Sequence, residues 1–203
     1  MNRKSPKFYN YPVLFLTFSL LLGSIVLLFW TYSIIWPSQL SIAYAQKVVL
    51  FLGYHLITVI FGSLFFGVIV HELLHGLTFA YFSPNKYKDI RFGVNALFVY
   101  CHCKAALLRN HYLLGALMPA VLLGVLPIGL GLAMGNLYLF LFGIFQIFSS
   151  VFDVYIAIRL VRVPKYVLVQ DYSDRVGYQL IYPSHAAPTP WDFSRKHDPS
   201  IFT

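Results

Sequence analysis

Long apolar stretches with almost no charge dominate this chain and set its fold class. No Asp, Glu, Lys or Arg occurs in residues 8–46, 48–71 or 110–152. A helix that crosses the hydrocarbon core of a bilayer needs roughly 20 apolar residues, and these gaps are long enough to hold several. The pattern predicts an all-α membrane protein with four transmembrane helices, at about Pro12–Trp36, Val48–Phe82, His111–Met134 and Leu137–Val161.

Shorter segments outside these helices have the composition of strands. Ile90–Cys103, between the second and third spans, is rich in Phe, Val, Tyr and Cys and is expected to form one or two strands. Lys165–Gln170 and Gly177–Tyr182 have the same character. We therefore expect a small cytoplasmic β element within a single transmembrane domain that covers residues 1–182. Residues 183–203 are rich in Pro, Ser and charge, which is typical of a flexible cytoplasmic tail.

The charged residues lie at the ends of the apolar stretches. The chain is 59% hydrophobic and only 11% charged, with a net charge of +8, which favours a multi-pass protein of the cell membrane. Lys and Arg gather before the first span, between spans two and three, and after the fourth, whereas the first loop has only Lys47. Because basic loops stay in the cytoplasm, both termini are expected there. Positive charge that flanks apolar segments suits the lipid bilayer as a partner, and no nucleic acid is expected.

The sequence His71-Glu72-Leu73-Leu74-His75, inside the second span, contains the candidate metal-binding and catalytic residues. Residues four apart lie on one face of a helix, so the two imidazoles can bind one ion. Glu72, the only glutamate of the chain, is placed to act as a general base on a metal-bound water. A charged side chain is costly inside a bilayer, which favours a functional role for it. The alternative interpretation, two histidines satisfied in a helix bundle, leaves this carboxylate unpaired.

A catalytic zinc needs a third protein ligand, for which Asp153 is the leading candidate. It is the only other acidic residue inside a predicted span. At about 1.5 Å per residue, its depth below the cytoplasmic boundary agrees with that of His71 within a few ångströms. His102 and His111 are the rival ligands. One polar stripe at helical spacing is expected to face the bundle interior, formed by Gln146, Ser149, Ser150 and Asp153.

The sequence Cys101-His102-Cys103 also contains possible metal ligands. Side chains alternate along a strand, so only the two cysteines could share a face, with the histidine opposite. Two cysteines cannot build a disulfide framework, and no second pair of ligands is evident. The segment is therefore interpreted as a plain strand.

The zinc motif and its context resemble a known family. HELLHG in one span (His71–Gly76), Pro119 in the next long span and Asp153 late in the last look like the site-two-protease-like intramembrane metalloproteases. The closer resemblance, over roughly residues 51–182, is to a bacterial family of short, four-span zincin peptidases once classed as domains of unknown function. One departure is clear in Ser149–Val154, because site-two proteases usually have Asn and Pro before the ligand Asp and Gly after it.

The resemblance implies a zinc-dependent intramembrane endopeptidase, and residues 1–182 would then form one metallopeptidase domain. It implies Zn²⁺ on His71, His75 and Asp153, with Glu72 as the catalytic base that activates a zinc-bound water. The substrate would be a membrane protein or peptide that is cut near the cytoplasmic side. The alternative is a non-catalytic metal-binding scaffold or transport subunit of the membrane, which needs no base beside its ligands. A hydrolase of lipids or other small amides is a third reading.

Overall fold

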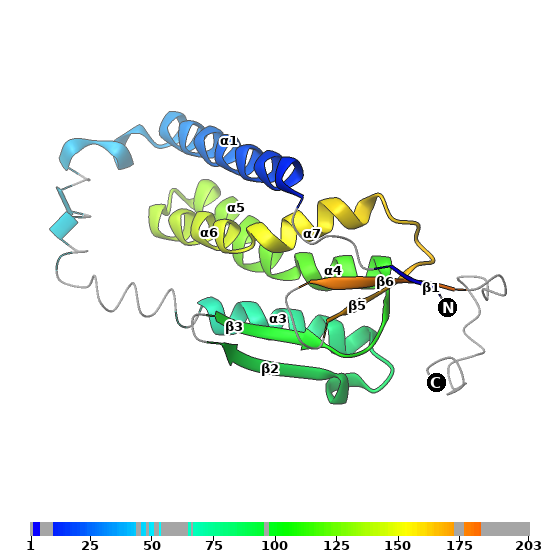
Figure 1. Ribbon diagram of the computed structural model, residues 1–203. Helices are drawn as coiled ribbons and strands as arrows, with labels where there is room; N and C mark the ends of the chain where they lie inside the picture. The colour runs from blue at the N-terminus through cyan, green and yellow to red at the C-terminus, as the bar shows by residue number, and fades with distance from the viewer. Residues whose placement is uncertain are drawn as a thin grey trace.

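The computed structural model describes residues 2–4, 10–43, 46–47, 49–50, 53, 65, 67–95, 98–172 and 177–183. In Figure 1, helix α1 (Tyr11–Ile35) lies on one side of the molecule, and helix α3 (Gly67–Phe82) lies on the other with the hairpin of β2 (Ile90–Asn95) and β3 (Phe98–Cys103). Helices α4 (Arg109–Pro119), α5 (Leu126–Met134), α6 (Leu137–Ser149) and α7 (Val151–Val161) lie between them. Strands β1 (Asn2–Lys4), β5 (Leu168–Asp171) and β6 (Tyr178–Tyr182) gather at the end where α7 ends.

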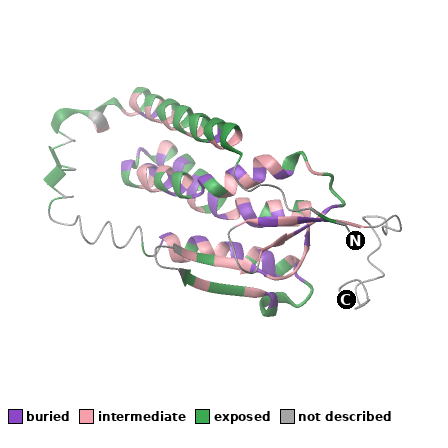
Figure 2. Cartoon of the chain, viewed as in Figure 1, coloured by how far each residue is buried: buried purple, intermediate pink, exposed green. Residues whose placement is uncertain are grey.

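Two of the predicted spans are helices long and apolar enough to cross a membrane, which is consistent with membrane association. Helix α1 (Tyr11–Ile35) begins at Asn10, whose side-chain oxygen accepts a hydrogen bond from the Val13 N–H (3.4 Å). Most of its residues are exposed (Figure 2), as a lipid-facing helix requires. The second is a 26-residue run that consists of α4 (Arg109–Pro119), a π-helical stretch (Ala120–Val125) and α5 (Leu126–Met134).

The predicted span Leu137–Val161 is helical, but it consists of two helices that meet at a bend of 56°. Helix α6 (Leu137–Ser149) ends at Ser150, and α7 (Val151–Val161) begins immediately after it. The Ser150 hydroxyl and backbone N–H both donate to the Gln146 carbonyl, at 3.0 and 3.1 Å. Serine side chains that bond to the backbone in this way compete with the helical ladder and bend it. The bend also breaks the predicted polar stripe, because Gln146 and Ser150 are buried but Ser149 is exposed.

Helix α3 (Gly67–Phe82) covers the C-terminal part of the predicted second span. Of residues 48–66 the structure describes only 49–50, 53 and 65, so most of the first half of the predicted span Val48–Phe82 lies outside the described residues. Within the described residues, two helices could cross a membrane, or three if the bent pair α6–α7 counts as one span. The predicted flexible tail likewise falls almost wholly outside the described residues.

The turn between the third and fourth predicted spans is fixed by a glycine. Gly135 has φ +64°, a conformation that glycine adopts without steric cost. A Cβ there would also lie 2.8 Å from the ring of Trp36. The Trp36 indole N–H donates to the Leu132 carbonyl (2.8 Å), which ties the end of α1 to the end of α5. The turn thus brings α6 back along α5, and both pack on α1 through one apolar cluster of Tyr32, Ile128, Leu137 and Phe140.

The predicted strands are confirmed, but they belong to two sheets. After a short 3₁₀ turn (Lys86–Asp89), β2 (Ile90–Asn95) and β3 (Phe98–Cys103) form an antiparallel hairpin. The second sheet has the order β1-β6-β5-β4 and is antiparallel throughout. The sequence did not predict two short edge strands of this sheet. Its strands are β1 (Asn2–Lys4), β4 (Leu107–Leu108), β5 (Leu168–Asp171) and β6 (Tyr178–Tyr182).

The four-stranded sheet fixes the helices that carry the candidate site. One buried cluster joins α3, α4 and α7 to β5 and β6, formed by Phe79, Cys103, Leu107, Tyr112, Ala116, Leu160, Val167, Val169, Tyr178 and Leu180. At the end of β5, Asp171 accepts hydrogen bonds from the Tyr112 hydroxyl (2.5 Å) and from the Cys103 N–H (3.0 Å). Burial raises the pKa of the Asp171 carboxyl, and these two hydrogen bonds act in the opposite direction. One carboxyl group therefore links the sheet, the hairpin and α4.

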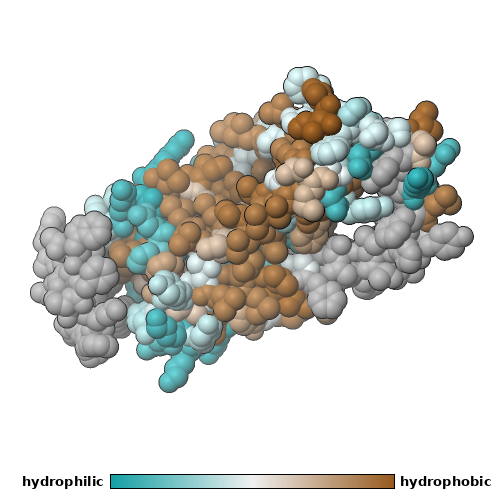
Figure 3. Space-filling model, turned by 180° about the vertical axis from the view of Figure 1, so that it is seen from behind, coloured by the Kyte–Doolittle hydropathy of each residue, from teal (hydrophilic) through white to brown (hydrophobic). Residues whose placement is uncertain are grey.

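Hydropathy on the surface agrees with a membrane setting. Figure 3 shows apolar side chains gathered over the middle of the molecule, with hydrophilic side chains toward its ends. Large exposed apolar patches are rare on soluble monomers and mark contact with lipid or a partner.

Candidate metal centre

His71 and His75 lie one turn apart on the buried face of α3. Their rings meet edge to face with centroids 4.8 Å apart, and their Nε2 atoms are 3.2 Å apart. The helical spacing of the two residues therefore brings both nitrogens to one point, as the sequence predicted.

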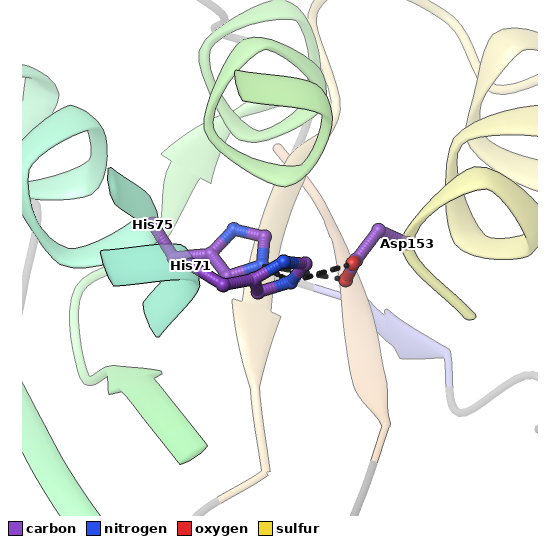
Figure 4. Close-up of side chains that lie close together, drawn as sticks. All are labelled: His71, His75 and Asp153. Atoms are coloured by element: carbon purple, nitrogen blue, oxygen red, sulfur yellow. Dashed lines mark hydrogen bonds and ion pairs between the residues drawn. The ribbon is translucent and has the colours of Figure 1, made fainter. Parts of the chain in front are cut away.

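Asp153, in the first turn of α7, points into the same space (Figure 4). Its Oδ2 lies 3.2 Å from His71 Nε2, and its Oδ1 lies 3.5 Å from His75 Nε2. Among the described residues, these three form the only group of three or more His, Cys, Asp or Glu side chains that could hold a metal ion. Two helices far apart in sequence, α3 and α7, thus bring their side chains to one point.

The donor atoms are spaced as a tetrahedral ion requires. With Zn–N and Zn–O distances of about 2.0–2.2 Å, tetrahedral geometry separates ligand atoms by roughly 3.3–3.6 Å. The observed separations of 3.2, 3.2 and 3.5 Å are close to these values. The described residues supply three ligands, and a catalytic zinc site combines three protein ligands with an open fourth position. The residues present therefore fit a zinc ion.

A backbone carbonyl holds His75 in the tautomer that a metal ligand needs. His75 Nδ1 lies 2.9 Å from the carbonyl oxygen of Gly115 on α4. A carbonyl only accepts, so Nδ1 carries a proton, and in the neutral imidazole the lone pair is then on Nε2, which faces Asp153 and His71. Gly115 has no side chain, which lets Phe79 of α3 lie against its backbone. The close approach of the two helices puts the carbonyl within reach of the imidazole.

Pro119 explains why this carbonyl is free. In an α-helix the Gly115 carbonyl would accept from the N–H four residues later, but residue 119 is a proline without an N–H. The Gly115 carbonyl therefore accepts a hydrogen bond from His75 instead. His71 Nδ1, by contrast, is buried without a hydrogen-bond partner among the residues that the structure describes.

Replacing Pro119 with Ala is expected to weaken zinc binding by about tenfold, because the new N–H competes for the Gly115 carbonyl and loosens His75. A competition titration with a chelator measures the dissociation constant. Pro127→Ala in the same helical run is the matched control, since it restores an N–H two turns further along. Equal zinc affinities for wild type and Pro119→Ala would contradict this role of the proline.

Glu72 lies beside the three candidate ligands. It is half-buried, and its carboxylate interacts electrostatically with His71, His75 and Asp153. The carboxylate also interacts with the backbone N–H of Cys101 on strand β3. Glu72 therefore occupies the space between the candidate ligands and the hairpin.

The rival ligands lie elsewhere. The His111 ring stacks on Phe82 with centroids 4.2 Å apart, and His102 Nδ1 lies 3.8 Å from Asp171 Oδ2. Cys101 and Cys103 are free thiols on β3. Burial raises the pKa of Cys101 and raises that of Cys103 to about 12, so both stay protonated at neutral pH, unlike thiolate ligands. These observations agree with the interpretation of Cys101-His102-Cys103 as a plain strand.

Comparison with known families agrees with this site. The model of a family described as "Putative zincin peptidase" matches residues 64–168, just over half of the chain. The chain belongs to this family. No curated protein and no solved structure matches it. Membership in the zincin peptidase family indicates a zinc metallopeptidase, and the matched segment contains α3, the hairpin and α4 to α7. It therefore includes His71, Glu72, His75 and Asp153.

The sequence analysis missed two groups of this zincin peptidase, the Gly115 carbonyl that contacts His75 and the Asp171 carboxyl that links β5 to α4 and β3. The Gly115 carbonyl carries no side-chain signal, although the four-residue spacing of Gly115 and Pro119 was a possible clue. Asp171 fell in a segment expected to link two strands, and its contacts to Tyr112 and Cys103 depend on the folded chain.

Proposed function

We propose that this protein is a zinc-dependent intramembrane endopeptidase that hydrolyses a peptide bond of a membrane-associated protein near the cytoplasmic side. The observation that carries the proposal is the convergence of His71 Nε2, His75 Nε2 and the Asp153 carboxylate next to Glu72. A site built only to hold a metal has no use for a further carboxylate at that position. The family match supports the same class of reaction.

The residues divide the reaction between them. A bound zinc ion would supply a Lewis acid that lowers the pKa of water and polarises the scissile carbonyl. Glu72 takes a proton from the attacking water, whose oxygen forms a bond to the carbonyl carbon. As the C–N bond breaks, Glu72 returns the proton to the leaving amine. Asp153 and the two imidazoles stay deprotonated at the facing atoms throughout, which the Gly115 carbonyl enforces for His75.

The substrate segment is expected to bind in an extended form. A peptide bond inside a helix has its amide groups in intrahelical hydrogen bonds, which keeps it away from the site. Strand β3 pairs with β2 along one edge, and the backbone N–H of Cys101 reaches toward Glu72. A substrate strand that adds to β3 would therefore place its carbonyl groups beside Glu72.

Metal removal tests the proposal. The full chain, purified in a neutral detergent, is incubated with a mixture of single-span membrane-protein segments, and new N-termini are identified by mass spectrometry. We expect cleavage that falls to background on treatment with a chelator and returns when Zn²⁺ is added. Bound zinc without cleavage of any segment would instead support a scaffold or transport subunit.

A further inference from the structure

A cavity of about 110 Å³ lies between the start of α1 and the end of α7, apart from the metal centre. Its lining residues are Asn10, Val13, Ile158, Arg159 and Arg162. These five include two cations and no acidic side chain. The cavity therefore suits an anionic group.

The lining changes from polar to apolar along both helices in the same direction. On α1, Asn10 precedes the helix and Val13 lies inside it; on α7, Arg162 follows the helix and Ile158 lies inside it. The polar ends therefore lie at the boundary where both helices leave the apolar layer, and the apolar ends face into that layer. A ligand with a charged head and an apolar continuation matches both ends, whereas a free anion would leave the apolar wall unused.

Contacts with Tyr155 hold one of the two cations, Arg159, in place. The Arg159 guanidinium lies over the Tyr155 ring, 5.6 Å from its centroid, and donates to the Tyr155 hydroxyl (3.2 Å). That hydroxyl also accepts from the Asn10 N–H (2.8 Å), which joins α7 to the start of α1. Arg162 is exposed three residues later, on the same side of the helix. Two guanidinium groups are thus presented at one boundary position, and guanidinium forks bind phosphate oxygens well.

We propose that this cavity binds the phosphate group of an anionic phospholipid, with the beginning of its acyl chains against Val13 and Ile158. The site does not depend on zinc or on peptidase activity. Because α7 also carries Asp153, a lipid bound here contacts the helix that supplies a candidate metal ligand.

Lipid binding to the full chain in neutral detergent tests the proposal, with native mass spectrometry as the readout. Phosphatidylglycerol, phosphatidylcholine and inorganic phosphate are compared at equal concentration, and phosphatidylglycerol is expected to bind best. Arg162→Gln should lower its affinity about tenfold through loss of a charge-assisted hydrogen bond, and Arg162→Lys should retain most of it. Val13→Trp should lower it as well by filling the apolar end.

Two matched variants distinguish a built site from general surface effects. Arg91→Gln removes one exposed charge on β2, and Leu16→Trp adds the same ring to an exposed position of α1; both should bind as wild type does. Equal binding of the two lipids, or equal losses in Arg162→Gln and Arg91→Gln, would overturn the proposal. Displacement of the lipid by inorganic phosphate at equal concentration would overturn the assignment to a lipid.

Discussion

Replacing Glu72 with Gln is expected to lower peptide hydrolysis by about two to four orders of magnitude, the usual contribution of a general base. Zinc content should not change, because the three candidate ligands do not include Glu72. The amide has nearly the volume of the carboxylate but cannot take up the proton from water. Initial rates on the segment that is cut fastest, together with elemental analysis of the same samples, measure both effects.

Glu72→Asp provides the matched control, since it keeps the carboxylate but withdraws it by one methylene group. Its activity should fall between those of wild type and Glu72→Gln. An active Glu72→Gln protein would refute the assignment of the base, even if zinc proves essential. A protein that loses zinc together with activity would show that Glu72 acts as a ligand.

Removing any of the three converging side chains is expected to lower zinc affinity by more than about 100-fold, more than the loss of an outer-shell partner costs. His71→Ala, His75→Ala and Asp153→Ala each leave two ligands on an ion that needs three from the protein. The dissociation constants come from chelator competition, as for Pro119→Ala. Activity should fall with occupancy, and added zinc should restore only part of it.

The rival ligands provide the controls for this series. His102→Ala and His111→Ala remove imidazoles that lie against Asp171 and Phe82, so zinc affinity should stay near the wild-type value. If Asp153→Ala leaves zinc affinity unchanged, the third ligand has been assigned wrongly. A loss of zinc affinity in His111→Ala would indicate a rearranged site in which α4 supplies the third zinc ligand.

Sequence patterns predicted those parts of the fold that follow from local composition. Uninterrupted apolar runs gave α1 and the helical run Arg109–Met134, and strand-like composition gave the hairpin and β5–β6. The bend at Ser150 was missed because hydropathy does not register how two serine hydroxyls compete for the Gln146 carbonyl. Strand β1 was missed because Asn-Arg-Lys has no strand pattern and forms only where β6 offers an edge.

The candidate site was predictable to the extent that helical geometry fixes it. The spacing of His71 and His75 determines that their nitrogens meet on one face, and matching depths brought Asp153 into consideration. Backbone groups behind the ligands could not be foreseen, because the Gly115 carbonyl becomes available only when α3 packs closely on α4. Helical periodicity therefore predicts the ligands, whereas the backbone group that holds His75 depends on contacts between segments distant in sequence.

The pairing of β1 with β6 constrains how the chain threads the bilayer. Both strands belong to one sheet, so residues 2–4 and 178–182 must lie on the same side of the membrane. The chain between them then traverses the bilayer an even number of times. Helix α1, the run 109–134 and the bent pair α6–α7 would amount to three passages. An odd number of passages would place β1 and β6 on opposite sides of the membrane. The passage that the sequence predicts at Val48–Phe82, with the zinc motif inside it, would make the total even.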